Sequence, residues 1–271
     1  MNIFISADME GICGVFGLHQ WESGGSGYER ACEWMAAEVN AAIEGAVAAG
    51  ARRIVVKDAH CDGNNIDLEK LHPAAELISG WGPLNSMVEG ISPEFHALIL
   101  IGYHARAATA DATFAHTWSR NVLELRVNGT PVGEAEWAAA FAGHFGVPVA
   151  MITGDDKLAD QVRETIPAGF EFVVTKTGWS FNAAQMRPIA MVRQEIRETT
   201  GRVLSQPRRL PVYRPSLPAT ITVRFRQWEG LHACEALPNV RRLSVDTFEY
   251  AAADFIEAHK YFSTLNRLAK P

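Results

Sequence analysis

Short runs of consecutive apolar residues alternate along the chain with longer segments in which apolar side chains recur at helical spacing. The runs at residues 2–6, 53–57, 97–101 and 147–152 predict buried strands, because they are apolar on both faces and have strand length. Two of the longer segments predict helices, at residues 31–47 and at residues 133–145. Strands apolar on both faces that alternate with helices are typical of the α/β class. We therefore expect a three-layer α/β/α arrangement around a largely parallel sheet.

Local signals mark where several of these elements begin and end. Ser26 and Glu29 have the spacing of a capping box before the first helix, and Gly50 is suited to stop it. Residues 122–132 predict a hairpin, because Asn128-Gly129 is a turn pair between two apolar segments. On the alanine-rich helix at residues 133–145, Trp137 and Phe141 could pack into the core or into an interface between subunits.

The composition of the chain changes at residues 205–218, where the segment "SQPRRLPVYRPSLP" contains four prolines. Because proline fixes φ and removes a backbone donor, this segment predicts a connection. We expect a metal-binding catalytic α/β domain at residues 1–205 and a smaller C-terminal α/β portion at residues 206–271. In the latter, residues 219–225 predict a half-buried strand, and residues 247–268 predict one long final helix.

Composition excludes several classes of partner. The 271 residues are 48% hydrophobic and 21% charged, which is an ordinary balance for a globular protein. The formal net charge of -6 leaves no basic excess to neutralise a nucleic acid. No apolar run is long enough to span a membrane, and Asp8 interrupts the region where a signal peptide would be apolar, so a cytoplasmic location is expected. The four cysteines have no C-x-x-C spacing and do not indicate a disulfide scaffold.

Polar side chains follow the predicted strands at the point where each strand ends. Asp8 and Glu10 follow the first strand, His60 follows the second, His104 follows the third, and Glu134 follows the hairpin. Ligands of open α/β sheets bind at this edge, and carboxylates with imidazoles suit a divalent metal such as zinc. Each residue also has an ordinary alternative, as a turn or cap carboxylate or as a surface histidine. None of the specific zinc spacings is present, so the residues alone leave both interpretations open.

Several longer blocks add a resemblance to a known family. They are "SADMEGICGV", "DAHCDGNN", "LHPAAELISG", "SMVEG", "GYHARA" and "PVGE". With these blocks the chain resembles the zinc-dependent D-aminopeptidase family, the dipeptide-operon metallopeptidases, over nearly its whole length and most densely from Asn2 to Asp156. The resemblance implies two zinc ions per subunit, a fold of two α/β domains, and a ring-shaped decamer.

The resemblance also implies roles for six residues. Asp8 would bridge the two zinc ions, Glu10 and His104 would complete one site, and His60 and Glu134 the other. A further family histidine, proposed as catalytic, matches His116 in "FAHTW".

The activity implied is that of a di-zinc aminopeptidase. It would remove N-terminal residues, with D-preference, from short peptides or amino-acid amides by means of metal-activated water. Two alternatives stay open. One is a dinuclear metal phosphoesterase or amidohydrolase, although the chain lacks the G-N-H-D block usual in such phosphoesterases. The other is a non-catalytic, metal-holding subunit that binds peptides.

Three features depart from the family pattern. Cys13 and Cys61 stand where serine is typical, and each predicts either a small buried residue or a thiol near the metals. The segment "FGLHQWESGG" also differs, and we expect this loop to shape the choice of substrate, with His19 as a surface histidine.

Overall fold

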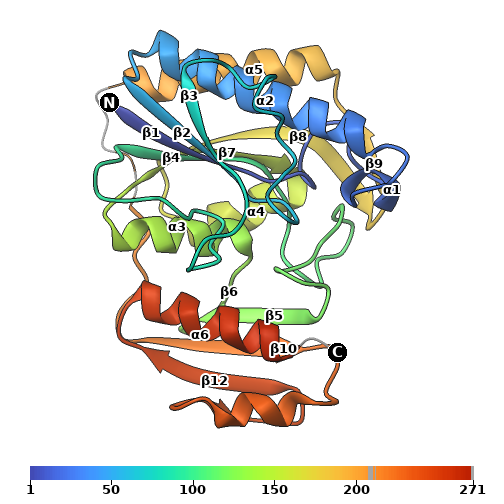
Figure 1. Ribbon diagram of the computed structural model, residues 1–271, viewed down its shortest axis with the longest axis vertical. Helices are drawn as coiled ribbons and strands as arrows, with labels where there is room; N and C mark the ends of the chain where they lie inside the picture. Colours follow the sequence, from blue (N-terminus) through green and yellow to red (C-terminus); the bar gives the residue numbers. More distant parts are fainter. Residues whose placement is uncertain (207–209, 211, 270–271) are drawn as a thin grey trace.

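Two β-sheets of different size organise the protein. The computed structural model describes residues 1–206, 210 and 212–269. Figure 1 shows a large sheet between two layers of helices, and below it a smaller sheet with one helix, α6, on one face. This arrangement confirms the predicted α/β class with a smaller C-terminal part.

The large sheet has seven strands in the order β3-β2-β1-β4-β7-β8-β9. All neighbouring strands run parallel except the last pair, which is antiparallel, so the predicted largely parallel sheet is confirmed. The strands are β1 (Asn2–Ala7), β2 (Arg53–Asp58), β3 (Ala75–Ile78), β4 (Ala97–Tyr103), β7 (Val149–Asp155), β8 (Glu171–Ser180) and β9 (Ala183–Met186). In the middle of the sheet, β1 pairs with both β2 and β4.

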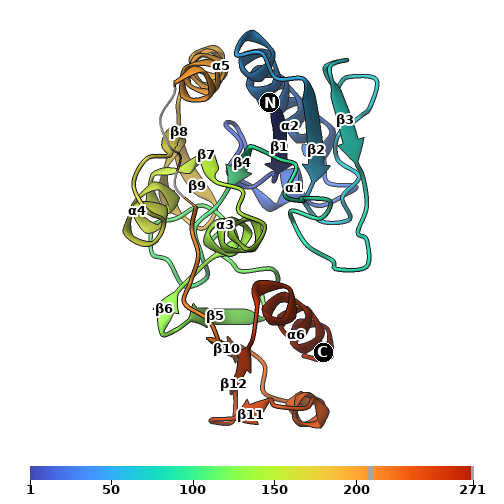
Figure 2. The same cartoon turned by 90° about the vertical axis from the view of Figure 1, so that its left-hand side faces the viewer.

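Helices cover both faces of this sheet and complete the predicted three layers (Figure 2). One face carries α2 (Tyr28–Ala48), preceded by the short α1 (Leu18–Trp21), together with α5 (Ile189–Ser205). The other carries α3 (Glu134–His144) and α4 (Asp156–Thr165). Because strand side chains alternate, Ile3 and Ile5 of β1 pack into one apolar cluster and Phe4 into the other. None of the helices among the described residues is both long and apolar enough to cross a membrane.

The smaller sheet has five antiparallel strands in the order β11-β12-β10-β5-β6. They are β5 (Val122–Val127), β6 (Thr130–Pro131), β10 (Ala219–Phe225), β11 (Arg241–Arg242) and β12 (Thr247–Ala252). The hairpin prediction is confirmed, because Asn128 and Gly129 turn between β5 and β6 with φ of 52° and 81°. The division at residues 205 and 206 stays a prediction. The sheet order adds that β5 and β6 come from within the first range.

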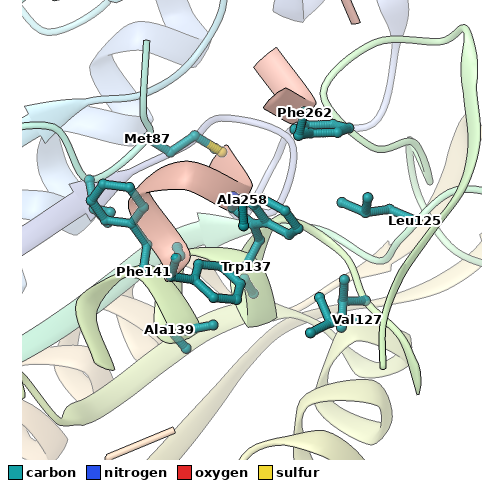
Figure 3. Packing of buried hydrophobic residues seen from close by; sticks show 14 of the residues in the cluster. Met87, Leu125, Val127, Trp137, Ala139, Phe141, Ala258 and Phe262 are labelled. Atoms are coloured by element: carbon teal, nitrogen blue, oxygen red, sulfur yellow. The ribbon is translucent and has the colours of Figure 1, made fainter. Parts of the chain in front are cut away.

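Aromatic packing joins the smaller sheet to the larger one. Figure 3 shows Trp137 and Phe141 of α3 together with Phe262 of α6 (Phe255–Leu268) and the β5 residues Leu125 and Val127. The indole nitrogen of Trp137 also donates a hydrogen bond to Nδ1 of His259 on α6, at 3.0 Å. Trp137 and Phe141 therefore belong to the core, and they fix α3 between the two sheets.

Three local predictions need correction or limits. The capping box is wrong, because Gly27 is the N-cap of α2 and no side chain caps that end. The single helix at residues 247–268 is also wrong, because the alternation of Phe248, Tyr250 and Ala252 buries one face of strand β12 before α6 begins. Of the proline-rich connection, residues 207–209 and 211 lie outside the described residues. A 3-10 helix, η1 (Leu231–Ala236), was not predicted.

Candidate metal centre

The five predicted metal ligands meet at the carboxyl edge of the large sheet. Asp8 and Glu10 follow β1, His60 follows β2, and His104 follows β4. Because β1 lies between β2 and β4, the carboxyl ends of these three strands are neighbours. Glu134 is the first residue of α3 and reaches the same place from the side. All five side chains are buried, and they form two ligand-like groups that share Asp8.

A glycine makes the turn after β1 fit against β4. The amide of Gly11 donates to the carbonyl oxygen of Gly102 at 2.7 Å. A Cβ on Gly11 would lie 1.9 Å from the carbonyl oxygen of Tyr103, so no larger residue fits without moving the backbone. The buried Lys176 ammonium holds the same turn by donating to the carbonyl oxygens of Glu10, Ile12 and Val15. The D-x-E-G order thus combines two acidic side chains with the backbone approach that positions them.

The two oxygens of Asp8 face different histidines. Its Oδ1 lies 3.2 Å from Nδ1 of His60, which is also 3.0 Å from Oε2 of Glu10. Its Oδ2 lies 3.5 Å from Nε2 of His104, which is also 3.5 Å from Oε1 of Glu134. The distances therefore pair Glu10 with His60 and Glu134 with His104. The resemblance implied the other pairing.

Backbone carbonyls fix the orientation of the imidazoles. His60 Nε2 lies 2.8 Å from the carbonyl oxygen of Trp21, and His104 Nδ1 lies 3.0 Å from that of Ala105. A carbonyl oxygen can only accept, so each of these nitrogens carries the hydrogen. In the neutral ring the other nitrogen then presents a lone pair, and here it faces carboxylate oxygens. Asp8 Oδ2 and His104 Nε2 are buried without a hydrogen-bond partner among the described residues.

The pKa values of Asp8, His60 and His104 are all raised, so each of these groups holds its proton more tightly than usual. Burial, with Glu10 nearby, raises the pKa of Asp8 to about 8. Burial alone would lower the pKa of His104, but Glu134, together with Glu10 and Asp8, raises that pKa to about 10. Burial likewise opposes protonation of His60, yet Glu10 holds the pKa of His60 well above its ordinary value. In the protein alone, bound protons supply the positive charge that the carboxylates need.

A pair of divalent cations fits the same need. Imidazole nitrogen and carboxylate oxygen are the ligands that zinc takes in catalytic sites. In metal-bound histidines, the ring nitrogen that does not bind the metal usually donates a hydrogen bond, often to a backbone carbonyl, and this bond orients the ring. Cations between these groups would give partners to the unpaired Asp8 Oδ2 and His104 Nε2. The residues present therefore fit zinc.

His116 lies beside this cluster. Its ring stacks on that of His104 with centroids 4.1 Å apart and planes 9° apart. Its Nδ1 lies 2.7 Å from the carbonyl oxygen of Phe114, which leaves Nε2 3.7 Å from Glu10 Oε1 and 3.8 Å from Glu134 Oε1. Burial, with His104 nearby, lowers the pKa of His116 below its ordinary value. His116 also forms a third ligand-like group with Glu10 and His104.

The loop that carries His116 is held in a strained backbone conformation. Four of its non-glycine residues have left-handed φ values between 55° and 61°: Ala108, Asp111, Phe114 and Trp118. Each such residue costs about 1–3 kcal/mol, so other contacts must hold the loop. The amide of Phe114 donates to the carbonyl oxygen of Phe181 at 2.8 Å, and the amide of Trp118 donates to Oε1 of Glu134 at 2.5 Å. The second bond couples the loop to the cluster.

The two cysteines that depart from the family pattern, Cys13 and Cys61, differ in their exposure. Cys13 is buried, as one of its two interpretations predicted, and its thiol contacts the carbonyl oxygen of Arg187. Cys61 is exposed, so the buried interpretation is wrong for it. Its sulfur lies 3.2 Å from Nε2 of His60, on the side of the ring that faces away from Asp8 and Glu10.

Some side chains around the cluster, namely Trp81, Met87 and Trp118, were not predicted as part of a site. A cavity of about 110 Å³ lies at the cluster. It is lined by the polar residues Asp8, Glu10, His60, His116 and Glu134 and by Trp21, Trp81, Met87 and Trp118. Trp21 belongs to the loop that departs from the family pattern, so that loop does reach the site. His19 in the same loop is exposed, as predicted. Asp58, the last residue of β2, accepts from the amides of Asn65 and Ile66 and holds the loop after His60 instead of joining the cluster.

Known proteins are similar to this chain over nearly its whole length. A family model described as D-aminopeptidase matches residues 1–264. A D-aminopeptidase of Bacillus subtilis (strain 168) is 32% identical over 270 residues, which are 99% of this chain and 98% of that relative.

A solved structure is similar over the same extent. It is the Zn-dependent D-aminopeptidase DppA from Bacillus subtilis, described as a self-compartmentalizing protease. The TM-score is 0.94 at 31% sequence identity, and the match covers 99% of this chain and 98% of that chain.

Proposed function

The chain belongs to the D-aminopeptidase family and is a metallo-aminopeptidase of that kind, and from this premise we propose a di-zinc enzyme. It would remove N-terminal D-residues from short peptides or amino-acid amides. The observation that carries the proposal is the position of Asp8, whose two oxygens face two different histidines, one of them across a gap that no hydrogen bond fills.

We propose a ligand set that follows the measured distances. One zinc ion would be held by Asp8, Glu10 and His60, and the other by Asp8, His104 and Glu134. This set keeps Asp8 as the bridging ligand but exchanges the partners that the resemblance implied for each histidine. Three carboxylates for two divalent ions also leave the site with a small net positive charge, which suits binding of a carbonyl oxygen.

The bound zinc ions would supply a nucleophilic water near neutral pH and would polarise the scissile carbonyl. The protein supplies the proton transfer. His116 Nε2 faces the cluster and carries no hydrogen in the neutral ring, because Nδ1 donates to the carbonyl oxygen of Phe114. It would therefore take a proton from the attacking water at Nε2 and deliver it to the leaving amine, or, once charged, stabilise the developing oxyanion.

We further propose that subunits assemble into a closed ring, with ten as the expected number. The support is that the solved relative is described as a self-compartmentalizing protease. An enclosed site would admit short peptides and exclude folded proteins. The cavity of about 110 Å³ at the proposed metal ligands is lined by tryptophans, and its small volume would likewise favour short substrates.

The activity itself is tested with paired substrates. Zinc-loaded protein should hydrolyse D-alaninamide faster than L-alaninamide, and chelation followed by zinc should abolish and restore the rate. Release of alanine, measured by chromatography, reports both. Equal rates on the two enantiomers would reject the D-preference, and activity that survives complete metal removal would reject the metallopeptidase mechanism.

His116→Ala should separate catalysis from metal binding. The variant should keep two zinc ions and the fold, but kcat should fall by about 10²–10⁴-fold with a smaller change in KM, because a positioned acid–base group is lost. Steady-state kinetics with elemental analysis of the same sample checks both statements. His232→Ala, a change at an exposed histidine of η1, is the control for loss of an imidazole.

Two results would reassign His116. Loss of zinc in His116→Ala would make it a ligand, as its group with Glu10 and His104 would allow. A near-normal kcat would return proton transfer to a carboxylate such as Glu134.

The assembly is tested by light scattering coupled to size-exclusion chromatography. We expect a particle about ten times the 29.7 kDa of one chain, with the peptidase activity in the same fraction. A stable and fully active monomer would contradict the ring.

A further inference from the structure

A second and larger cavity also has His116 in its lining. It has a volume of about 700 Å³ and lies between the two sheets. Its walls come from the loop at residues 107–116, the residues that lead into β5, Phe181 of the β8–β9 turn, and Arg226 with Gln227 after β10. Cavities of this size hold small-molecule ligands or a few peptide residues.

His116 lines both this cavity and the small one that contains the candidate metal ligands. A substrate whose scissile bond lies at His116 would therefore place its N-terminal residue on the metal side. The remainder of the peptide would extend into the larger cavity.

The larger cavity carries positive charge without a balancing carboxylate. Its described lining includes Arg120 and Arg226 but no Asp or Glu. Arg226 Nε donates to the carbonyl oxygen of Arg120 at 3.1 Å, and the Arg120 guanidinium lies 5.8 Å from the centre of the Phe181 ring. Within the described part of the chain, neither guanidinium forms an ion pair. Many of the other arginines do, namely Arg53, Arg126, Arg187, Arg197, Arg202, Arg224, Arg241 and Arg242.

We propose that Arg120 and Arg226 bind the C-terminal carboxylate of a short peptide substrate. Guanidinium groups match carboxylates with paired, charge-assisted hydrogen bonds, and an unmodified peptide has such a carboxylate at the end opposite its free amine. The inference rests on the proposed function, because it uses the scissile bond at His116 to orient the peptide. It assigns short peptides with a free carboxylate as the preferred substrate class, ahead of amides.

The test compares acids with amides of the same length. The substrates are D-alanine followed by one, two or three glycines, each as the free acid and as the C-terminal amide. At the length that reaches the arginines, the wild-type enzyme should prefer the acid by about tenfold in kcat/KM, chiefly through KM. This preference should shrink as ionic strength rises, because both side chains are exposed.

Substitution of the two arginines should remove the preference. In the double variant Arg120→Ala, Arg226→Ala, the ratio of kcat/KM for acid over amide should fall to about one, and each single variant should give an intermediate ratio. A ratio is insensitive to a general loss of activity. The matched control for each single variant is Arg241→Ala, which likewise removes one positive charge, but from β11 at the edge of the smaller sheet, where Arg241 pairs with Glu249. It should keep the wild-type ratio.

Two outcomes would overturn the inference while the proposed function stands. One is equal kcat/KM for acid and amide at every length in the wild-type enzyme. The other is a preference for the acid that persists in the double variant. Failure of the zinc-loaded enzyme to hydrolyse any of these substrates, or D-alaninamide, would overturn the proposed function and this inference with it.

Discussion

Buried carboxylates that face the lone pairs of imidazoles are the constraint on which the site depends. Backbone carbonyls commit one nitrogen of His60, His104 and His116 as a donor, so the other nitrogen of each ring faces acidic oxygens. Such an arrangement is unfavourable in a buried site unless positive charge lies between the groups. Protons can supply that charge, as the raised pKa values of Asp8 and His104 show. Two zinc ions would supply it more completely and would at the same time provide the chemistry of a hydrolase.

The fold supplies this constraint through the order of its strands. Parallel strands end at one edge, and the central position of β1 brings the loops after β2 and β4 to either side of Asp8. Gly11 allows the turn after β1 to approach β4 closely, and Lys176 fixes this turn by donating hydrogen bonds to three carbonyl oxygens. The aromatic contacts between α3 and α6 then hold the smaller sheet against the larger one, and the arginine-containing cavity beside His116 is lined by residues next to strands of both sheets.

Much of this could be predicted from the sequence, for identifiable reasons. Continuous apolar runs predicted β1, β2, β4 and β7, and the Asn128-Gly129 pair predicted the hairpin, because both signals are local. The helices α4 and α5 and the strands β3, β8 and β9 gave weaker patterns and were not predicted. Residues 247–268 were misread because a short alternating strand directly precedes an amphipathic helix. The pairing of His60 with Glu10 depends on distances between loops, which no periodicity encodes. Cys61 is exposed and has a left-handed φ of 46°, and the sequence does not reveal such a conformation for a residue other than glycine.

The central claim is that Asp8 bridges two metal ions, and metal stoichiometry tests it most directly. The zinc content of purified, zinc-resupplied protein should be about two ions per chain. Asp8→Ala should lose both, whereas His60→Ala and His104→Ala should each lose chiefly one. Asp58→Asn removes the charge of a buried carboxylate at the end of β2 that lies outside the cluster, and keeps an oxygen that can accept from the amides of Asn65 and Ile66. It is the control for loss of a neighbouring acid and should keep both ions. One ion or none in the wild-type protein, or two ions retained in Asp8→Ala, would contradict the bridging site.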